Sequence, residues 1–157
     1  MKQLLLVSWL LSLSAILGLP EVKADVGMPL IFGNHMVLQQ DTRITIWGWA
    51  DAGENIEVLF AGQKVRTTAN ADGTWQVKLK PVKTKKKGET LTITGKNKLV
   101  YSDVLVGDVW VASGQSNMEW GIKVRKEYAD DIAHSEDSLL RLFFVPKNTS
   151  LQPLSEI

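Results

Sequence analysis

The chain has 157 residues, of which 45% are hydrophobic and 22% are charged, and its 18 lysines and arginines against 17 aspartates and glutamates give a formal net charge of +1. This balance gives no electrostatic support for binding to nucleic acid or to an anionic membrane, because both require clustered positive charge. The chain contains no cysteine, which excludes a disulfide framework and a thiolate metal site. With only two histidines in addition, we expect neither a metal nor a cofactor.

The first 24 residues have the pattern of a secretory signal peptide. Lys2 precedes an apolar run from Leu4 to Leu19, and small or compact residues precede a cleavage site after Ala24. The alternative is an N-terminal membrane anchor, but the run is short for a membrane span and is interrupted by serines and a glycine. We therefore predict an exported protein, periplasmic or secreted, that has no membrane attachment after cleavage.

Residues 25–102 contain short runs of alternating apolar and polar residues, separated by turn residues. The expected strands are residues 43–49, 54–60, 63–68, 75–79, 90–94 and 99–104. Ala61-Gly62 and Asp72-Gly73 are short enough to close hairpins. Strands at this spacing, without a helical period, predict an antiparallel β-sandwich domain.

The pattern changes near residue 103. Residues 104–113 form a nearly continuous apolar run, which is typical of a strand buried on both faces of a parallel sheet. Apolar residues then recur at helical spacing from Val124 to Ile132, and residues 139–145 are expected to form another buried strand that stops at Pro146. Residues 103–157 are thus predicted to be the first βαβ part of a doubly wound α/β domain. Because one such unit cannot cover both faces of its own sheet, we expect the chain to be part of a longer gene product.

Ser116 is the main candidate for chemistry, because it follows Gly114-Gln115 where the expected buried strand ends and a helix begins. A side chain at that junction points into the crevice at the carboxyl edge of the sheet, and free backbone N–H groups can stabilise a developing oxyanion. Residues 116–119, Ser-Asn-Met-Glu, also match the capping box, in which the serine only caps a helix. Spacing alone leaves both interpretations open.

Three segments resemble a known family. The block GDVWVASGQSNMEW at residues 107–120 resembles the first signature block of the sialate O-acetylesterases, a branch of the SGNH (GDSL-like) hydrolases. The segments MPLIFGNHMVLQQ at residues 28–40 and IWGWA at residues 46–50 resemble the β domain that precedes the catalytic domain in that family. The resemblance implies a β-sandwich followed by the start of an SGNH-type catalytic domain.

The resemblance also implies a reaction and a set of site residues. Members of this family remove acetyl groups from sugars with a serine nucleophile, through an acetyl-enzyme and without a metal. Carried over, Ser116 is the nucleophile and its own backbone N–H is one oxyanion donor, while Gly114, Gln115 and Asn117 belong to the motif. The expected substrate is an O-acetylated carbohydrate, either sialic acid or an acetylated polysaccharide.

The general base is harder to assign. Family members take it from an Asp-x-x-His pair near the far end of the catalytic domain, and Asp131-Ile132-Ala133-His134 matches that string. We do not assign the base to this pair, because it falls opposite the apolar stripe of the expected helix, towards solvent, and comes too early in the chain. His35 is expected to be a loop or packing residue. The chain is therefore predicted to lack its catalytic histidine and aspartate, and to be weakly active or inactive alone.

A function of another class is carbohydrate binding without catalysis. Trp47 and Trp49 lie on one face of an expected strand, and exposed aromatic rings stack on sugars. The alternative is that both rings pack in the core or against the following domain. A non-catalytic β-sandwich module would have no use for a buried strand that ends in Gly-Gln-Ser.

Overall fold

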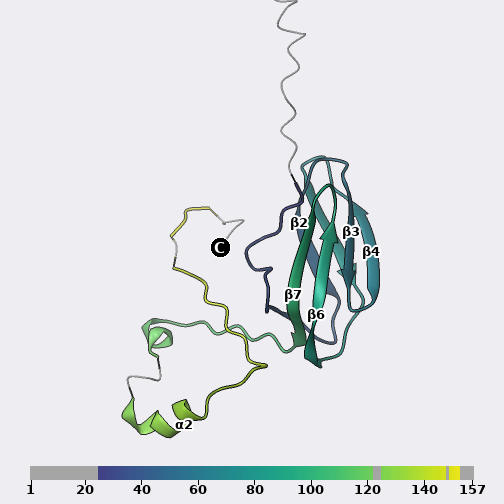
Figure 1. Ribbon diagram of the computed structural model, residues 1–157. Helices are drawn as coiled ribbons and strands as arrows, with labels where there is room; N and C mark the ends of the chain where they lie inside the picture. Colours follow the sequence, from purple (N-terminus) through teal and green to yellow (C-terminus); the bar gives the residue numbers. More distant parts are fainter. Residues whose placement is uncertain (1–24, 122–124, 148, 153–157) are drawn as a thin grey trace, which may run out of the picture.

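The computed structural model describes residues 25–121, 125–147 and 149–152. Within these ranges the molecule is built mostly from β-sheet, with a few short helical turns towards the C-terminus (Figure 1). The strands are β1 (Val37–Gln39), β2 (Ile44–Trp49), β3 (Asn55–Phe60), β4 (Gln63–Thr68), β5 (Thr74–Leu79), β6 (Lys85–Thr94) and β7 (Lys98–Gly107). The expected signal peptide, residues 1–24, lies outside the described residues. None of the described helices has the length and apolar character that crossing a membrane requires.

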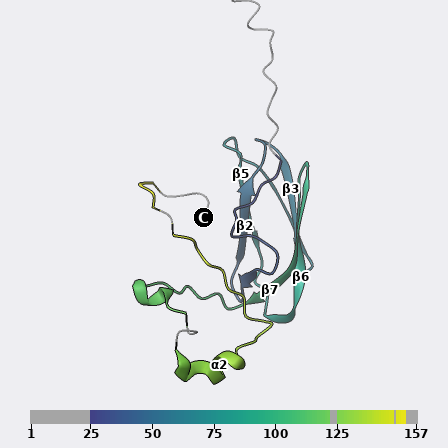
Figure 2. The same ribbon diagram turned by 60° about the vertical axis from the view of Figure 1, so that its left-hand side comes forward.

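The strands form two sheets that lie face to face, as the turned view shows (Figure 2). One sheet has five strands in the order β1-β7-β6-β3-β4, and the other pairs β2 with β5. All pairs are antiparallel except β1 with β7, so the larger sheet is mixed. Parallel pairing of β1 with β7 was not expected, because β1 is only three residues long and was not recognised as a strand.

One hydrophobic core fills the space between the sheets. Its members are the inward-facing residues of alternating strands, as the period of two requires. Side chains with almost no exposed surface come from both sheets: Ile46, Ile56, Val58, Phe60, Leu79, Leu91, Ile93 and Val104. Trp75 from β5 is buried with them, and its indole N–H donates to the carbonyl of Trp49 at 3.1 Å, so its polar atom is satisfied.

The two expected hairpins have different outcomes. Ala61 and Gly62 join β3 to β4, both with positive φ (49° and 75°), which is the backbone that a two-residue turn between paired strands needs. The hairpin expected at Asp72-Gly73 is wrong, since β4 and β5 belong to different sheets. There the carboxylate of Asp72 accepts hydrogen bonds from the backbone and hydroxyl of Thr74, which makes a local turn before β5.

The expected buried strand over residues 104–113 is only partly correct. Val104, Leu105 and Val106 are buried, but they are the last part of β7, which starts at Lys98 and ends at Gly107. Beyond it the chain leaves the sheets, and Trp110 and Val111 are about 90% exposed. The apolar run thus joins two environments: its first residues complete the core of the β domain, and the rest have no strand to pair with among the described residues. The expected domain boundary near residue 103 falls inside β7.

The βαβ unit expected after residue 103 does not form among the described residues. The predicted helix is present as a turn, η3 (Lys126–Tyr128), followed by α2 (Ala129–Ala133), and its expected first residue, Val124, lies outside the described residues. Residues 139–145 make no strand, which corrects that prediction, and Leu142 and Phe144 are at least 80% exposed. A buried parallel strand requires neighbouring strands for its backbone hydrogen bonds, and the described chain supplies none here.

Glu54 is a buried acidic residue in the β domain. Its side chain, 8% exposed, accepts hydrogen bonds from the backbone N–H groups of Asp51 at 3.2 Å and of Lys96 at 2.6 Å. These bonds connect the turn before β3 to the turn between β6 and β7. Glu54 and Lys96 are 42 residues apart in sequence, so the contact is a long-range one. The buried carboxylate therefore accepts hydrogen bonds from two backbone donors in two different turns.

Replacing Glu54 with leucine is expected to destabilise the β domain by about 1–3 kcal/mol, because the two hydrogen bonds that the Glu54 carboxylate accepts are lost. The change is measured as a shift in the midpoint of urea unfolding. Glu57→Gln is the control, since Glu57 pairs with Lys64 and Arg66 on the outer surface of β3 and β4, where solvent-exposed ion pairs contribute little to stability. Equal midpoint shifts in the two variants would show that the buried hydrogen bonds of Glu54 are unimportant.

Candidate functional site

Ser116 begins a short 3₁₀ turn, η1 (Ser116–Glu119), in the segment that follows β7. The residue in the capping position is Gln115, which has extended backbone angles and makes no capping hydrogen bond with its side chain. The turn is closed by the N–H of Met118, which donates to the carbonyl of Gln115 at 2.9 Å. Ser116 is thus inside the turn and does not cap it, so the capping-box interpretation is not supported.

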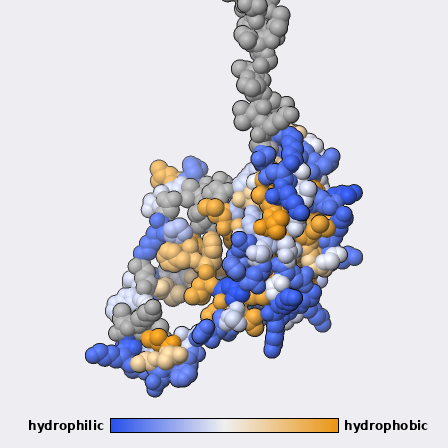
Figure 3. Space-filling view, in the orientation of Figure 1, coloured by the Kyte–Doolittle hydropathy of each residue, from blue (hydrophilic) through white to orange (hydrophobic). Residues whose placement is uncertain are grey.

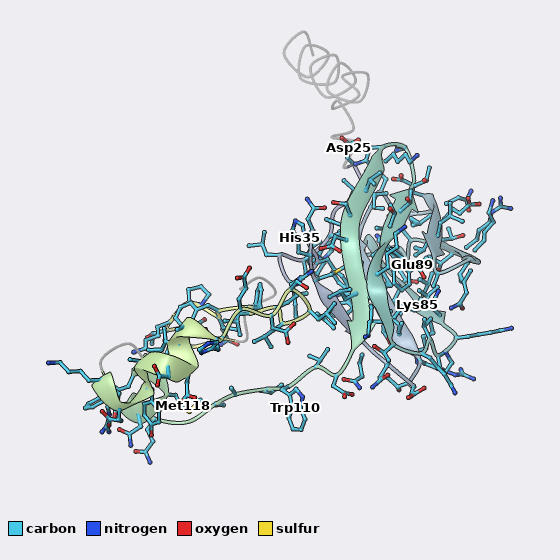
Figure 4. The ribbon with its side chains drawn as sticks, turned by 60° about the horizontal axis from the view of Figure 1, so that its bottom comes forward. Asp25, His35, Lys85, Glu89, Trp110 and Met118 are labelled. Carbon is cyan, nitrogen blue, oxygen red and sulfur yellow. The ribbon has the colours of Figure 1, made fainter. Side chains whose placement is uncertain are left out.

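The residues of the motif are exposed to solvent. Gly114, Gln115, Ser116 and Asn117 are all exposed, and the Ser116 hydroxyl has no hydrogen bond to another described residue. The side chain of Met118, labelled in Figure 4, lies over Gly114, where a Cβ atom would come within 2.7 Å of the Met118 Cγ. Glycine at position 114 therefore lets the methionine fold back over the chain that leads to the serine. The hydroxyl itself is free to meet a substrate.

A cluster of polar side chains holds the start of this segment against the β domain. The Gln40 side-chain amide donates to the Asp108 carboxylate at 3.1 Å, and the Gln39 side-chain oxygen accepts from the backbone N–H of Val109 at 2.8 Å. Gln39 is the last residue of β1 and Gln40 directly follows it, beside the end of β7. Sequence reasoning did not single out any of these residues, since nothing in the local pattern relates positions about 70 residues apart.

The structure does not join Asp131 and His134 into a catalytic pair. The Nδ1 atom of His134 lies 2.7 Å from the backbone carbonyl of Asp130, one turn earlier in α2, and makes no hydrogen bond to a carboxylate among the described residues. Both residues are exposed, as the helical pattern predicted. The ring nitrogen that a triad aspartate would orient is already occupied by the histidine's own helix.

His35 lies instead in an ionic cluster that the sequence did not predict. Its Nδ1 atom is 2.7 Å from the Asp103 carboxylate, and the same carboxylate oxygen accepts a hydrogen bond at 3.0 Å from the Arg141 guanidinium. His35 and Asp103 both have positive φ, 64° and 52°, which is uncommon for residues other than glycine. The cluster unites the loop before β1, the middle of β7 and the segment after α2. The structure shows no hydrogen bond between any of the three and Ser116.

The charge of Asp103 is stabilised by these partners. The hydrogen bond from His35, and then that from Arg141, hold the pKa of the Asp103 carboxyl below its ordinary value of 3.8. A lowered pKa in the folded state means that Asp103 stabilises the fold above pH 3.8, and that this contribution is lost as the pH falls through the lowered pKa. Near neutral pH the carboxylate is ionised, so its bond to Arg141 is a charge-assisted one.

The two tryptophans of β2 lie on the outer side of the two-stranded sheet, in different degrees of burial. Trp47 is 40% exposed and its ring meets that of Phe32 edge to face, with ring centroids 4.7 Å apart. Trp49 is half-buried beside Gly27, whose backbone pairs with it. Both rings are therefore partly packed and partly exposed. They belong to β2, whereas Ser116 lies outside the sheets in the segment after β7. Among the described residues, no three histidine, aspartate or glutamate side chains are grouped to hold a metal ion.

Comparison with known proteins extends this geometry. No family model matches the chain. It is 32% identical over 139 residues to the sialate O-acetylesterase of Mus musculus and 34% identical over 140 residues to that of Rattus norvegicus, in each case over 79% of this chain. The human sialate O-acetylesterase is 30% identical over 136 residues. The chain spans about a quarter of the length of these curated relatives.

A solved structure gives the same result for the fold. The crystal structure of a carbohydrate acetylesterase from Xanthomonas citri superposes with a TM-score of 0.78 and 37% sequence identity, over 83% of this chain and 30% of that one. The sequence and structure comparisons thus agree along most of the chain. Over the part that it spans, the chain is a homologue of the sialate O-acetylesterases.

Proposed function

We propose that the chain is the N-terminal part of an exported carbohydrate O-acetylesterase in which Ser116 is the nucleophile. The observation that carries the proposal is the exposed hydroxyl of Ser116 at the start of η1, which makes no hydrogen bond to another described residue, in a chain whose relatives are acetylesterases. The substrate class is an O-acetylated sugar, such as acetylated sialic acid or an acetylated polysaccharide. Export rests on the pattern of residues 1–24.

The proposed reaction has two steps. In the first, a base takes the proton of the Ser116 hydroxyl while its oxygen attacks the acetyl carbonyl carbon, the bond from that carbon to the sugar oxygen breaks, and the sugar leaves as an alcohol with the proton. In the second, water attacks the acetyl-serine and releases acetate, which regenerates the hydroxyl. The backbone N–H of Ser116 is one donor for the oxyanion of each tetrahedral intermediate.

The base and the other oxyanion donors are assigned to a later part of a longer protein. Both described histidines are engaged elsewhere, His35 by Asp103 and His134 by the carbonyl of Asp130. The quarter-length match to the relatives supports the same interpretation. So does the exposure of apolar side chains after β7, which Figure 3 shows as orange patches on the part of the molecule beside the sheets. The exposed large hydrophobic side chains after β7 include Val109, Trp110, Val111, Trp120, Leu140, Leu142, Phe143, Phe144 and Val145. So many exposed apolar side chains in one stretch of chain indicate a surface that a further part of the protein covers.

The other candidate function, carbohydrate binding by a non-catalytic module, is favoured by one observation, the exposed part of Trp47. It gives no role to the free hydroxyl of Ser116. The two functions make different predictions for a reagent that modifies only activated serines.

A fluorophosphonate probe is expected to label the longer protein at Ser116 and nowhere else, because only a serine with a general base reacts at a useful rate. Mass spectrometry of the tryptic peptides locates the label. Binding of sugar without any labelling would support the binding module instead.

Ser116→Ala in the longer protein is expected to lower kcat for hydrolysis of 4-nitrophenyl acetate by about 10³-fold or more, because the residual rate then comes only from binding and the oxyanion donors. Ser135→Ala is the matched control, since the Ser135 hydroxyl only donates to the carbonyl of Ile132 at the end of α2. Wild-type activity in Ser116→Ala would remove this serine from the mechanism.

The isolated 157-residue chain is expected to hydrolyse the same ester slowly, close to the rate of Ser116→Ala, because its serine has no base. The comparison uses equal molar amounts of the short and longer proteins in one assay. If the short chain is fully active and His134→Ala abolishes that activity, the assignment of the base to a later part of the protein is wrong.

A further inference from the structure

Two chain segments outside the sheets are attached to the β domain close to β7. The outgoing segment leaves β7 at Gly107 and is held through Asp108 and Val109 by Gln39, the last residue of β1, and by Gln40, which follows it. The returning segment, after α2, is held by Arg141, which reaches Asp103 in β7. Ser116 lies in the loop of chain between these two attachments.

The backbone at Asp103 is shaped for this contact. Between the pairs Leu91↔Tyr101 and Glu89↔Val104, β7 has one more residue than β6, so Ser102 and Asp103 form a bulge. Gly88 on β6 faces the bulge, and a Cβ atom there would come within 2.7 Å of the Asp103 Cα. The bulge, with its positive φ, turns the carboxylate out of the sheet towards His35, which is labelled in Figure 4. Strained backbone of this kind is typical of positions where a side chain must be held in a particular place for a contact or a function.

Arg141 is the corresponding residue on the returning segment. One of its terminal nitrogens donates to Asp103, and the other donates to the backbone carbonyl of Ser138 in its own segment. Its Nε atom is buried without a hydrogen-bond partner among the described residues. A surface arginine normally keeps this group in water, so the guanidinium is held at the junction despite the cost of burying a donor.

We propose that the β1–β7 edge is a docking surface for the catalytic part of the same polypeptide, with Asp103 as its ionic contact and the Gln39–Gln40 pair as its polar contact. The two contacts fix both ends of the loop of chain that carries Ser116, and so fix its orientation relative to the β domain. The catalytic role of the docked part rests on the proposed function. The docking itself rests only on the contacts of Asp103, Arg141, Gln39 and Gln40.

Asp103→Asn isolates the ionic contact from the fold of the bulge. Asparagine tolerates positive φ as well as aspartate does, so the backbone of β7 is kept while the charge that binds Arg141 is removed. Arg141→Met, outside the sheets, removes the same contact from the other side and keeps most of the apolar stem. If the two residues bind each other, the double variant has the effect of either single variant and not their sum.

The orientation can be measured without any enzymatic assay. The chain has no cysteine, so Val100→Cys on β7 and Leu142→Cys beside Arg141, both exposed, give two unique sites for spin labels in the full chain. Double electron–electron resonance then reports the distribution of distances between the β domain and the returning segment. We expect a narrow distribution in the labelled parent, and a broader one with a longer-distance population in Asp103→Asn and in Arg141→Met.

The size of the change follows from a single ion pair that is partly exposed. Loss of such a pair is expected to reduce the ratio of docked to undocked segment by up to about fivefold. Glu57→Gln in the labelled parent is the control, since it removes an ion-paired carboxylate on β3 and leaves the junction intact. Unchanged distributions in both junction variants, or a broad distribution in the parent, would overturn the docking surface. Either result leaves the role of Ser116 untouched, because the esterase assays test that role separately.

Discussion

The parallel pairing of β1 with β7 is the constraint on which the rest of the structure depends. Three residue pairs, from Val37↔Leu105 to Gln39↔Gly107, add β1 as the fifth strand, at one edge of the larger sheet. Val104, Leu105 and Val106 in the second half of β7 are buried, and Val104 and Val106 belong to the core between the sheets. The same pairs bring Gln39 and Gln40 beside Asp108, where the chain turns away from the sheet.

The β domain therefore determines where the segment of Ser116 begins. A strand that ended earlier would leave the apolar residues 104–106 exposed, and one that ran further would draw the serine towards the sheet. The bulge at Asp103 adds a second constraint a few residues before the end of β7, since it presents a carboxylate to the segment that returns after α2. The β domain has a complete hydrophobic core, whereas the chain after β7 exposes many apolar side chains. The β domain is therefore a folded unit, and the part that follows it needs more chain to bury its surface.

The sequence predicts the β domain well because its information there is local. Alternation in β2, β3 and β5, and the Ala61-Gly62 turn, each depend on a few adjacent residues, and each is confirmed. The Asp72-Gly73 hairpin was wrong because a turn motif does not state which sheet receives the next strand. The prediction of one buried strand over residues 104–113 was only partly correct for a related reason. Burial of the first residues of this run depends on β1, which lies about 70 positions earlier. The cluster of His35, Asp103 and Arg141 could not be predicted at all, because its members share no periodicity or spacing.

Ser116 was found through the resemblance of its surrounding block, and the exposure of its hydroxyl agrees with that assignment without testing it.

The central claim is that Ser116 becomes acetylated during turnover. The most direct measurement is mass spectrometry of the longer protein, quenched in acid within the first turnovers of an O-acetylated sugar and digested with a protease. The account predicts an acetyl group on the peptide that contains Ser116, absent when the substrate is omitted and absent in Ser116→Ala. Rapid deacetylation of the sugar with no acetyl group on that peptide, under conditions where acetylation precedes a slower hydrolysis, would contradict it.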